Sequence, residues 1–243
     1  MTKGIIIVPT FNEIENIERL VRNIFSLQRS FHILVVDDNS PDGTAARVRT
    51  LQAEFHDKLF LEERTGKLGL GTAYIHGFKW ALERDYDFIF EMDADFSHNP
   101  NDLVRLYNAC KREDADVAIG SRYITGVNVI NWPMNRVLMS WLASKYVRFI
   151  TGMEIHDTTA GFVCYKREVL ESIDLDNIQF VGYAFQIEMK FKAYLLKFKI
   201  KEVPVIFTDR TRGTSKMSGS IISEAVFGVI KMKIKSLFNR IKL

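Results

Sequence analysis

Short apolar runs alternate with segments of helical periodicity along the first half of the chain. Residues 5–8 are apolar throughout, as expected of a strand buried on both faces of a parallel sheet. Apolar residues then recur at helical spacing, and Asn12 is positioned to cap that helix. Strands are predicted at residues 33–36, 59–61, 88–92 and 117–120, with helices at 14–24, 44–55, 101–111 and one ending near 84. This alternation of strands and helices predicts a doubly wound α/β fold with a mostly parallel sheet.

The second half is less regular. It predicts an amphipathic helix at 133–150, a strand at 162–165, a helix at 184–197 and a strand at 199–207 that Pro204 assigns to a sheet edge. A polar loop at 208–219 precedes the last helix. We expect one catalytic domain over residues 1–219, including an interface helix at about 133–151, and a basic amphipathic helix at 220–243.

Composition adds few constraints. The 243 residues are 47% apolar and 26% charged, as in ordinary globular proteins, and the net charge of +3 does not indicate nucleic acid binding. Cys110 and Cys164 lie in apolar contexts, which predicts reduced core cysteines and fits a cytoplasmic protein. Asn12 follows the first apolar run too soon for a signal peptide, and no apolar stretch reaches the roughly 20 residues that span a bilayer. We therefore expect no transmembrane anchor.

Polar residues cluster directly after three of the predicted strands, at 9–13, 37–40 and 93–95. Ligands of such sheets bind beyond the carboxyl ends of the strands. A single cluster could simply cap the following helix, but three clusters at the same edge favour a ligand site.

Asp93 and Asp95 are the sharpest of these candidates. Two carboxylates separated by one residue after a buried strand can hold Mg²⁺ or Mn²⁺, which completes its shell with phosphate oxygens and water. Such an ion would neutralise a diphosphate leaving group. The glycine-rich stretch at 64–71 matches neither a Walker loop nor a dinucleotide fingerprint, so a flexible turn and a donor contact both remain open.

Several motifs together resemble the family 2 glycosyltransferases, and within them the polyprenol-phosphate (dolichol-phosphate) mannose synthases. The resemblance extends from about residue 4 to 219. Its motifs lie at residues 9–13, 36–44, 69–73, 92–100, 120–123, 135–136, 157–162, 209–210 and 213–216.

The resemblance implies a glycosyltransferase A-type fold and assigns the site residues by group. The nucleotide-sugar group is Pro9, Phe11, Glu13, Val36, Asp38, Asp93, Ala94, Asp95 and Lys216. The metal group is Asp93, Asp95 and Ser97; the acceptor-phosphate group is Arg122, Arg136, Ser140 and Arg210; Asp95, Arg122 and Arg210 are the catalytic candidates. Some relatives carry glutamine in place of Ser97, and many carry tyrosine in place of Phe11.

The implied reaction transfers mannose from GDP-mannose to a polyprenyl phosphate with inversion. A phosphate monoester is largely ionised at neutral pH, since its second pKa is about 6, so we assign no general base. Glucosyl or N-acetylglucosaminyl transfer from a UDP-sugar is the alternative reaction. A nucleotidyltransferase would need a glycine- and lysine-rich signature that residues 9–13 lack, and an inactive membrane-surface scaffold conflicts with the intact carboxylates and arginines.

Two segments predict attachment to a membrane surface. Residues 117–153 contain no acidic residue but carry a broad apolar stripe with four basic side chains. The terminal helix repeats this pattern, with five basic residues among apolar ones and no acid after Glu224. Basic amphipathic helices of this kind lie in anionic membrane interfaces. We expect peripheral association with the cytoplasmic face, although packing of either helix on the core is also open.

Overall fold

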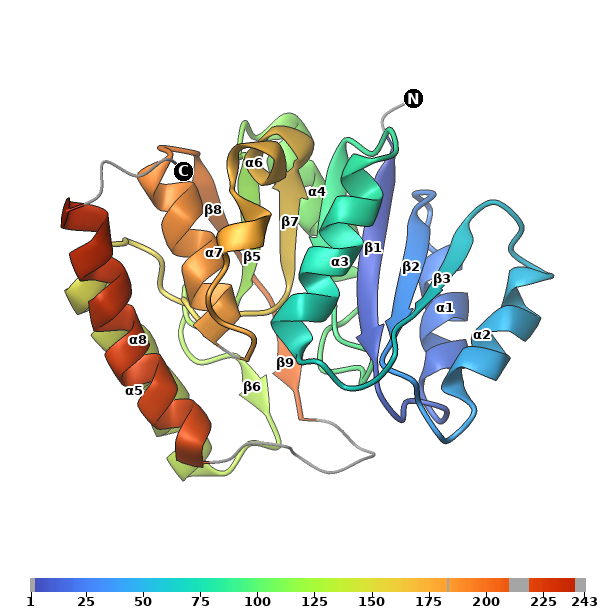
Figure 1. Ribbon diagram of the computed structural model, residues 1–243, viewed down its shortest axis with the longest axis horizontal. Coiled ribbons are helices and arrows are strands. Elements are labelled where there is room, and N and C mark those ends of the chain that lie inside the picture. Colours follow the sequence, from blue (N-terminus) through green and yellow to red (C-terminus); the bar gives the residue numbers. More distant parts are fainter. Residues whose placement is uncertain (1–2, 183, 210–218, 239–243) are drawn as a thin grey trace.

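A seven-stranded sheet forms the centre of the computed structural model, which describes residues 3–182, 184–209 and 219–238 (Figure 1). The strands are β1 (Gly4–Thr10), β2 (His32–Asp37), β3 (Leu59–Glu63), β4 (Phe88–Glu91), β5 (Val117–Ser121), β7 (Val163–Lys166) and β8 (Ile200–Pro204). Their order is β3-β2-β1-β4-β7-β5-β8, and only β7 runs antiparallel to its neighbours. The doubly wound, mostly parallel sheet predicted from the sequence is confirmed, and β8 lies at an edge as Pro204 indicated.

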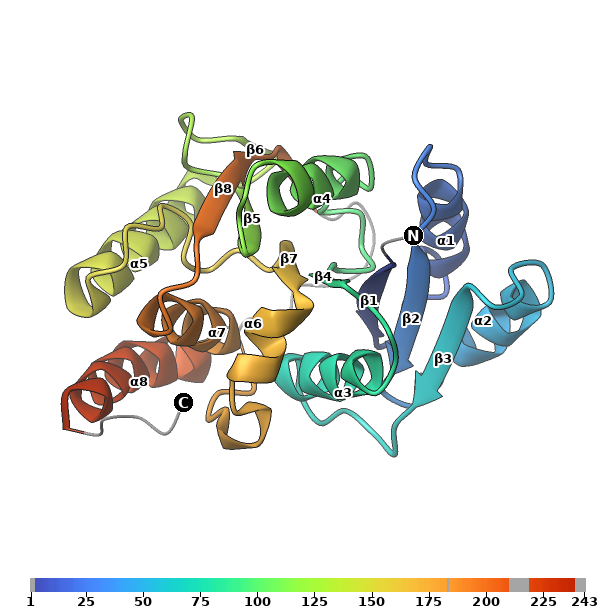
Figure 2. The same ribbon diagram turned by 90° about the horizontal axis from the view of Figure 1, so that it is seen from above.

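Helices cover both faces of the sheet (Figure 2). One apolar core packs the sheet against α1 (Ile17–Phe25), α2 (Thr44–Gln52) and α4 (Asp102–Arg112). The other core packs it against α3 (Leu70–Leu82), α6 (Arg167–Ser172) and α7 (Ala184–Leu195). Cys110 and Cys164 are buried thiols, as their apolar surroundings predicted.

Two expectations about local structure need correction. Asn12 does not cap α1: it has a φ of 61° in the preceding loop, and the helix begins only at Ile17, after Asn16. Residues 199–207 do not form one strand, because β8 ends at Pro204 and the chain then enters β9 (Phe207–Thr208). β9 pairs with β6 (Val129–Ile130) in a separate two-stranded ribbon that hydrophobic periodicity is too short to predict.

The long helices α5 (Met134–Thr151) and α8 (Gly219–Phe238) pack beside each other at the β8 end of the molecule (Figure 1). α8 also packs against α7, and its Val229 is 1% exposed. Tyr146 of α5 donates a hydrogen bond of 2.8 Å to the carbonyl of Val226. The core-packing alternative is therefore partly right for α8, although its other face is solvent-exposed. Among the described residues, no helix combines the length and apolar character needed to cross a bilayer.

Candidate active site

The carboxyl ends of four strands gather the predicted site residues at one edge of the sheet. β1 lies between β2 and β4, so Phe11, Asp38 and Asp93, which follow these three strands, belong to adjacent strand ends. β5 runs parallel to β4 because both pair antiparallel with β7. Arg122, which follows β5, is thereby brought to the same edge as Asp93.

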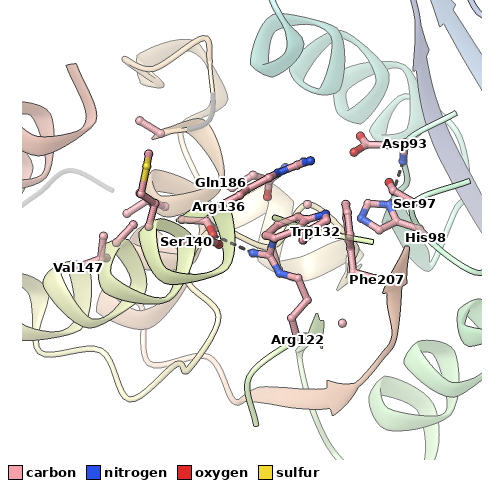
Figure 3. Close-up of a pocket in the computed structure, with 18 of the residues that line it drawn as sticks. Asp93, Ser97, His98, Arg122, Trp132, Arg136, Ser140, Val147, Gln186 and Phe207 are labelled. Carbon is pink, nitrogen blue, oxygen red and sulfur yellow. Dashed lines mark hydrogen bonds between the residues drawn. The ribbon is translucent and has the colours of Figure 1, made fainter. Parts of the chain in front are cut away.

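A cavity of 460 Å³ extends from this edge toward α5 and α8 (Figure 3). Its lining changes character along its length. Asp93, Asp95 and Ser97 line one end, and Arg122, Arg136 and Ser140 lie farther along. Beyond Ser140 the lining is mainly apolar, with contributions from α5, α7 and α8: Leu142, Ala143, Tyr146, Val147, Ile187 and Val226. The cavity therefore joins the predicted metal group to three of the four predicted acceptor-phosphate residues.

Hydrogen bonds from α3 and from within the turn hold the two carboxylates after β4. The Tyr74 hydroxyl donates to Asp93 Oδ1 at 3.2 Å, and the Ser97 amide donates to Asp95 Oδ1 at 3.0 Å. Phe96, between the two, adopts a φ of 61°, a conformation that costs a bulky L-residue energy and is tolerated mainly at functional sites. The turn thus holds both carboxylates in place before any ligand binds.

His98 lies in the same turn and hydrogen-bonds to the residue that begins it. Its Nδ1 accepts a hydrogen bond of 3.2 Å from the Asp93 amide, which assigns the ring proton to Nε2. Burial lowers the pKa of His98 to about 4, so the ring is neutral at physiological pH. The imidazole stacks on Phe162 at a centroid distance of 4.8 Å and meets the edge of Phe207 at 5.5 Å.

The donor set of this turn fits a hard divalent cation. Its groups are carboxylate and hydroxyl oxygens, and Ser97 Oγ is enclosed with no hydrogen-bond partner among the residues that the structure describes. Within those residues no group of three or more His, Cys, Asp or Glu side chains could hold a metal by itself. A site with two carboxylates suits Mg²⁺ or Mn²⁺ whose remaining ligands are phosphate oxygens and water.

Arg122 and Asp157 form a buried ion pair. The Arg122 Nε and Nη2 atoms donate to the two oxygens of Asp157 at 2.7 and 2.6 Å, and Nη2 also donates to Thr159 at 2.9 Å. Burial opposes the charge on Arg122, but the Asp157 carboxylate outweighs it and raises the arginine pKa. The guanidinium is therefore charged and fixed in orientation where it lines the cavity.

Arg136 and Ser140 lie one helical turn apart on α5, so both face the cavity. Arg136 donates to Asp209 at 2.8 Å, and its guanidinium lies 4.0 Å from the ring centroid of Trp132. Asp209 ends the described segment beyond β9. The β6–β9 ribbon, whose Thr208 amide donates to the Ser97 carbonyl at 3.3 Å, thus links the carboxylate turn to the arginines.

The predicted nucleotide residues lie beside this cavity, at the ends of β1 and β2. Asp38 forms a buried ion pair with Arg64, whose Nε donates to Oδ1 at 2.6 Å. Burial raises the pKa of Asp38, and Arg64 partly offsets this. Lys67 lies 5.1 Å from the ring centroid of Phe11. Val36 is fully buried within β2, so the structure exposes none of it toward a nucleotide.

Some predicted site residues do not line the cavity, and two others lie outside the described part of the chain. Pro9 and Glu13 lie at the end of β1 outside it, and the buried Ala94 packs in the core. Arg210 and Lys216 lie outside the described residues.

The structure also adds residues that the sequence did not single out: Arg64, His98, Trp132, Asp157, Thr159, Gln186 and Phe207. His98, Asp157 and Thr159 lie within the motifs that carry the family resemblance, and Arg64 lies in the glycine-rich stretch, which was the only sequence signal for these four residues. Trp132 lines the cavity through contacts with residues distant in sequence, such as Phe207, and the sequence gives no signal for such contacts.

The doubly wound sheet, the paired carboxylates after a central strand and the cationic groups at the same edge fit a nucleotide-sugar transferase. The model of glycosyl transferase family 2 matches residues 5–174, and the chain belongs to this family.

The chain is similar to two curated relatives over most of their length. It is 47% identical to the polyprenol monophosphomannose synthase of Mycolicibacterium smegmatis, over 98% of this chain and 89% of that protein. It is 45% identical to the undecaprenyl-phosphate mannosyltransferase of Micrococcus luteus, over 93% of this chain and 91% of that protein.

Among solved structures, glucosyl-3-phosphoglycerate synthase from Mycobacterium tuberculosis, in complex with Mn²⁺, UDP and glucosyl-3-phosphoglycerate, has a similar fold. The TM-score is 0.67 at 16% identity, over 97% of this chain and 79% of that one. This likeness confirms the glycosyltransferase A-type fold.

Proposed function

We propose that this glycosyltransferase transfers mannose from GDP-mannose to the phosphate of a polyprenyl phosphate, with inversion at the anomeric carbon. The observation that carries the proposal is the cavity, which joins two carboxylates, two arginines and an apolar arm in that order. An acceptor with a phosphate head and a long apolar chain matches the last two parts. The names of the two relatives, a polyprenol monophosphomannose synthase and an undecaprenyl-phosphate mannosyltransferase, both refer to a lipid with a phosphate head and a polyprenyl chain.

In this proposal the acceptor phosphate binds Arg122 and Arg136, with Ser140 as a further donor. Guanidinium groups suit phosphate oxygens because they offer several donors in a planar array. The polyprenyl chain then runs between α5 and α8, along Ala143, Val147 and Val226. Arg210 is expected to complete the phosphate site and Lys216 to contact the donor, as the motifs imply.

The donor nucleotide is assigned to the ends of β1 and β2, with Phe11 as a stacking surface and Asp38 as a polar contact. Asp93, Asp95 and Ser97 would hold Mg²⁺ or Mn²⁺. When bound, the ion would neutralise charge on the diphosphate as it departs. Pro9, Glu13, Val36 and Ala94 are assigned to the walls of the same nucleotide site.

The chemistry then needs no general base. An oxygen of the acceptor phosphate forms the new bond to the anomeric carbon, while the bond to the GDP oxygen breaks and its electron pair leaves with GDP. The acceptor oxygen is already anionic, so no proton is removed. His98 agrees with this mechanism, since its Nδ1 lone pair is occupied by the Asp93 amide and is not available to accept a substrate proton. The fixed charge of Arg122 stabilises the reacting phosphate electrostatically.

Incubation of the protein with GDP-mannose, Mn²⁺ and a short-chain polyprenyl phosphate should give a mannosylated lipid after solvent extraction. UDP-glucose and UDP-N-acetylglucosamine serve as matched donors. We expect product from GDP-mannose at a rate at least tenfold above either UDP-sugar. Faster transfer from a UDP-sugar would reject the donor assignment, and absence of any lipid-linked sugar would reject the acceptor.

We further propose that the exposed faces of α5 and α8 rest on the membrane from which the acceptor enters the cavity. On α8, Phe227, Ile230, Ile234 and Phe238 recur at helical spacing, and all are exposed. On α5, Met134, Leu138 and Phe149 are exposed. Of the five predicted basic residues, Lys233 faces inward, because it donates to the carbonyl of Thr151 at 3.0 Å and packs near Phe191. Arg240 and Lys242 lie outside the described residues. Attachment to the cytoplasmic face follows from the cytoplasmic origin expected for a GDP-sugar.

The triple change Phe227→Ser, Ile234→Ser and Phe238→Ser is expected to weaken binding to anionic vesicles by about 100-fold or more. Each buried apolar side chain contributes on the order of 1 kcal/mol or more to insertion, and tenfold in affinity corresponds to about 1.4 kcal/mol. Co-sedimentation with phosphatidylserine-containing vesicles measures the change. A truncation before α8 is a poorer test, because Val226 lines the cavity and Val229 packs on the core.

The matched control is Leu68→Ser, an exposed apolar residue in the loop between β3 and α3, outside both α5 and α8. Its vesicle binding should equal that of the wild type, and the thermal unfolding of both variants should be unchanged. Unaltered vesicle binding by the triple variant would rule out α8 as a membrane contact and leave α5 as the candidate.

A further inference from the structure

Trp132 contains a buried polar atom to which none of the substrate contacts proposed above is assigned. Its indole Nε1 is enclosed and has no hydrogen-bond partner among the described residues, although the side chain lines the cavity. An unsatisfied buried donor destabilises the fold, and native proteins rarely keep one without a reason. The indole nitrogen donates only, so the missing partner must be an acceptor.

The surroundings of Trp132 identify the kind of acceptor. Its ring lies 4.0 Å from the Arg136 guanidinium and 5.4 Å from that of Arg122, measured to the ring centroid (Figure 3). Both arginines are positive, and neither can accept a hydrogen bond. Ser140 lines the same part of the cavity. The group that suits all of these neighbours is an anion with several acceptor oxygens, and the phosphate of the proposed acceptor is such a group.

The backbone holds Trp132 firmly in this position. β6 ends two residues before it and pairs with β9, while Pro133 immediately follows it as the N-cap of α5. On the other side, the ring meets Phe207 of β9 at a centroid distance of 5.2 Å and an interplanar angle of 71°. The indole is therefore a preorganised part of the wall, and binding a ligand there orders little additional structure.

We infer that Trp132 is a binding residue of the acceptor-phosphate site, whose indole N–H donates a hydrogen bond to a phosphate oxygen of the polyprenyl phosphate. The inference rests on the proposed function, since it assigns a further ligand of the same acceptor. The nitrogen is enclosed before binding, so a neighbour must move. Arg136 is that neighbour, because its side chain is 28% exposed and pairs with Asp209 close to the surface.

The test compares Trp132→Phe with the wild type. Phenylalanine keeps an aromatic face for the arginines but removes the N–H. We expect the KM for a short-chain polyprenyl phosphate to rise about tenfold, which corresponds to 1.4 kcal/mol, with kcat and the KM for GDP-mannose within twofold of wild type. The unliganded variant should be at least as resistant to thermal unfolding as the wild type, because an unsatisfied donor has been removed.

Trp80→Phe is the matched control. Trp80 Nε1 donates to Glu62 at 3.1 Å, remote from the cavity, so this change should lower the unfolding temperature and leave the acceptor KM unaltered. An unchanged acceptor KM for Trp132→Phe would overturn the inference. An equal rise in the KM for GDP-mannose would also overturn it, by assigning the N–H to the donor.

A second measurement uses the unaltered binding site and does not depend on how Trp132→Phe folds. The chain has three tryptophans, so ¹⁵N-labelled protein gives three indole N–H signals, which Trp80→Phe and Trp141→Phe assign by elimination. Addition of short-chain polyprenyl phosphate without donor should shift the Trp132 signal downfield, as a new hydrogen bond requires. An unshifted signal under saturating acceptor overturns the inference. Failure of the wild type to form mannolipid would instead count against the proposed function, since this binding measurement needs no turnover.

Discussion

Replacement of Asp95 by asparagine is expected to lower the rate of mannose transfer by about 10³-fold or more while the fold persists. Asparagine Oδ1 can still accept the 3.0 Å hydrogen bond from the Ser97 amide, so the turn should keep its shape. The charge that would hold Mg²⁺ or Mn²⁺ is lost, and electrostatic stabilisation of this kind supplies several kcal/mol, at about 1.4 kcal/mol for each tenfold in rate. Turnover at saturating substrates and Mn²⁺ affinity by calorimetry in the presence of GDP measure the two effects.

Asp114→Asn is the control for this experiment, because Asp114 is an exposed carboxylate paired with Lys199 far from the cavity. It should retain wild-type turnover and metal affinity. Chelation of the metal from the wild type should reproduce the loss seen for Asp95→Asn. Wild-type turnover by Asp95→Asn at saturating Mn²⁺ would exclude Asp95 as a metal ligand.

Removal of the Arg122 guanidinium is expected to affect both stability and catalysis. Asp157 is fully buried, so Arg122→Met would remove the guanidinium that pairs with its carboxylate and cost about 3–5 kcal/mol in free energy of unfolding. The double variant Arg122→Met/Asp157→Asn removes both charges and should recover more than half of that loss. Urea unfolding of the wild type, Arg122→Met, Asp157→Asn and the double variant completes a double-mutant cycle, which gives the coupling free energy between the two residues.

Transfer to polyprenyl phosphate should remain at least 100-fold below wild type in the single and the double variant, with GDP affinity nearly unchanged. This combination would separate the role of Arg122 in the acceptor site from its role as a partner of Asp157. Activity restored in the double variant would mean that Arg122 acts only through the fold. Arg49→Met, which breaks an exposed pair with Glu63, is the control and should change neither property measurably.

Local sequence patterns predicted the elements that carry the site. Periodicity identified the strands that end before Phe11, Asp38, Asp93 and Arg122, because a buried strand must be apolar whatever it pairs with. Since parallel strands present their carboxyl ends at one edge, their order was not needed to expect a shared site. Boundaries were less certain: Asn12 proved not to be a cap, and the ribbon of β6 and β9 was missed.

The partners in the two buried ion pairs could not be predicted from local sequence patterns. Asp157 lies 35 residues beyond Arg122, and Arg64 lies 26 residues beyond Asp38, with no periodicity linking either pair. Each carboxylate has several arginines within the chain as possible partners. The partner is chosen by which groups lose their water together when the sheet and loops pack, and this depends on all the long-range contacts at once.

By itself the sequence determined the α/β class, the carboxylate turn at Asp93 and Asp95, and the amphipathic character of α5 and α8. These are local properties, fixed by side-chain order along one strand or helix. Only the tertiary structure decided that β7 runs antiparallel, that Trp132 lies against both arginines, and that α8 covers an apolar arm of the cavity. Such features arise from burial of surfaces distant in sequence, whose free energy is gained only when the whole chain packs.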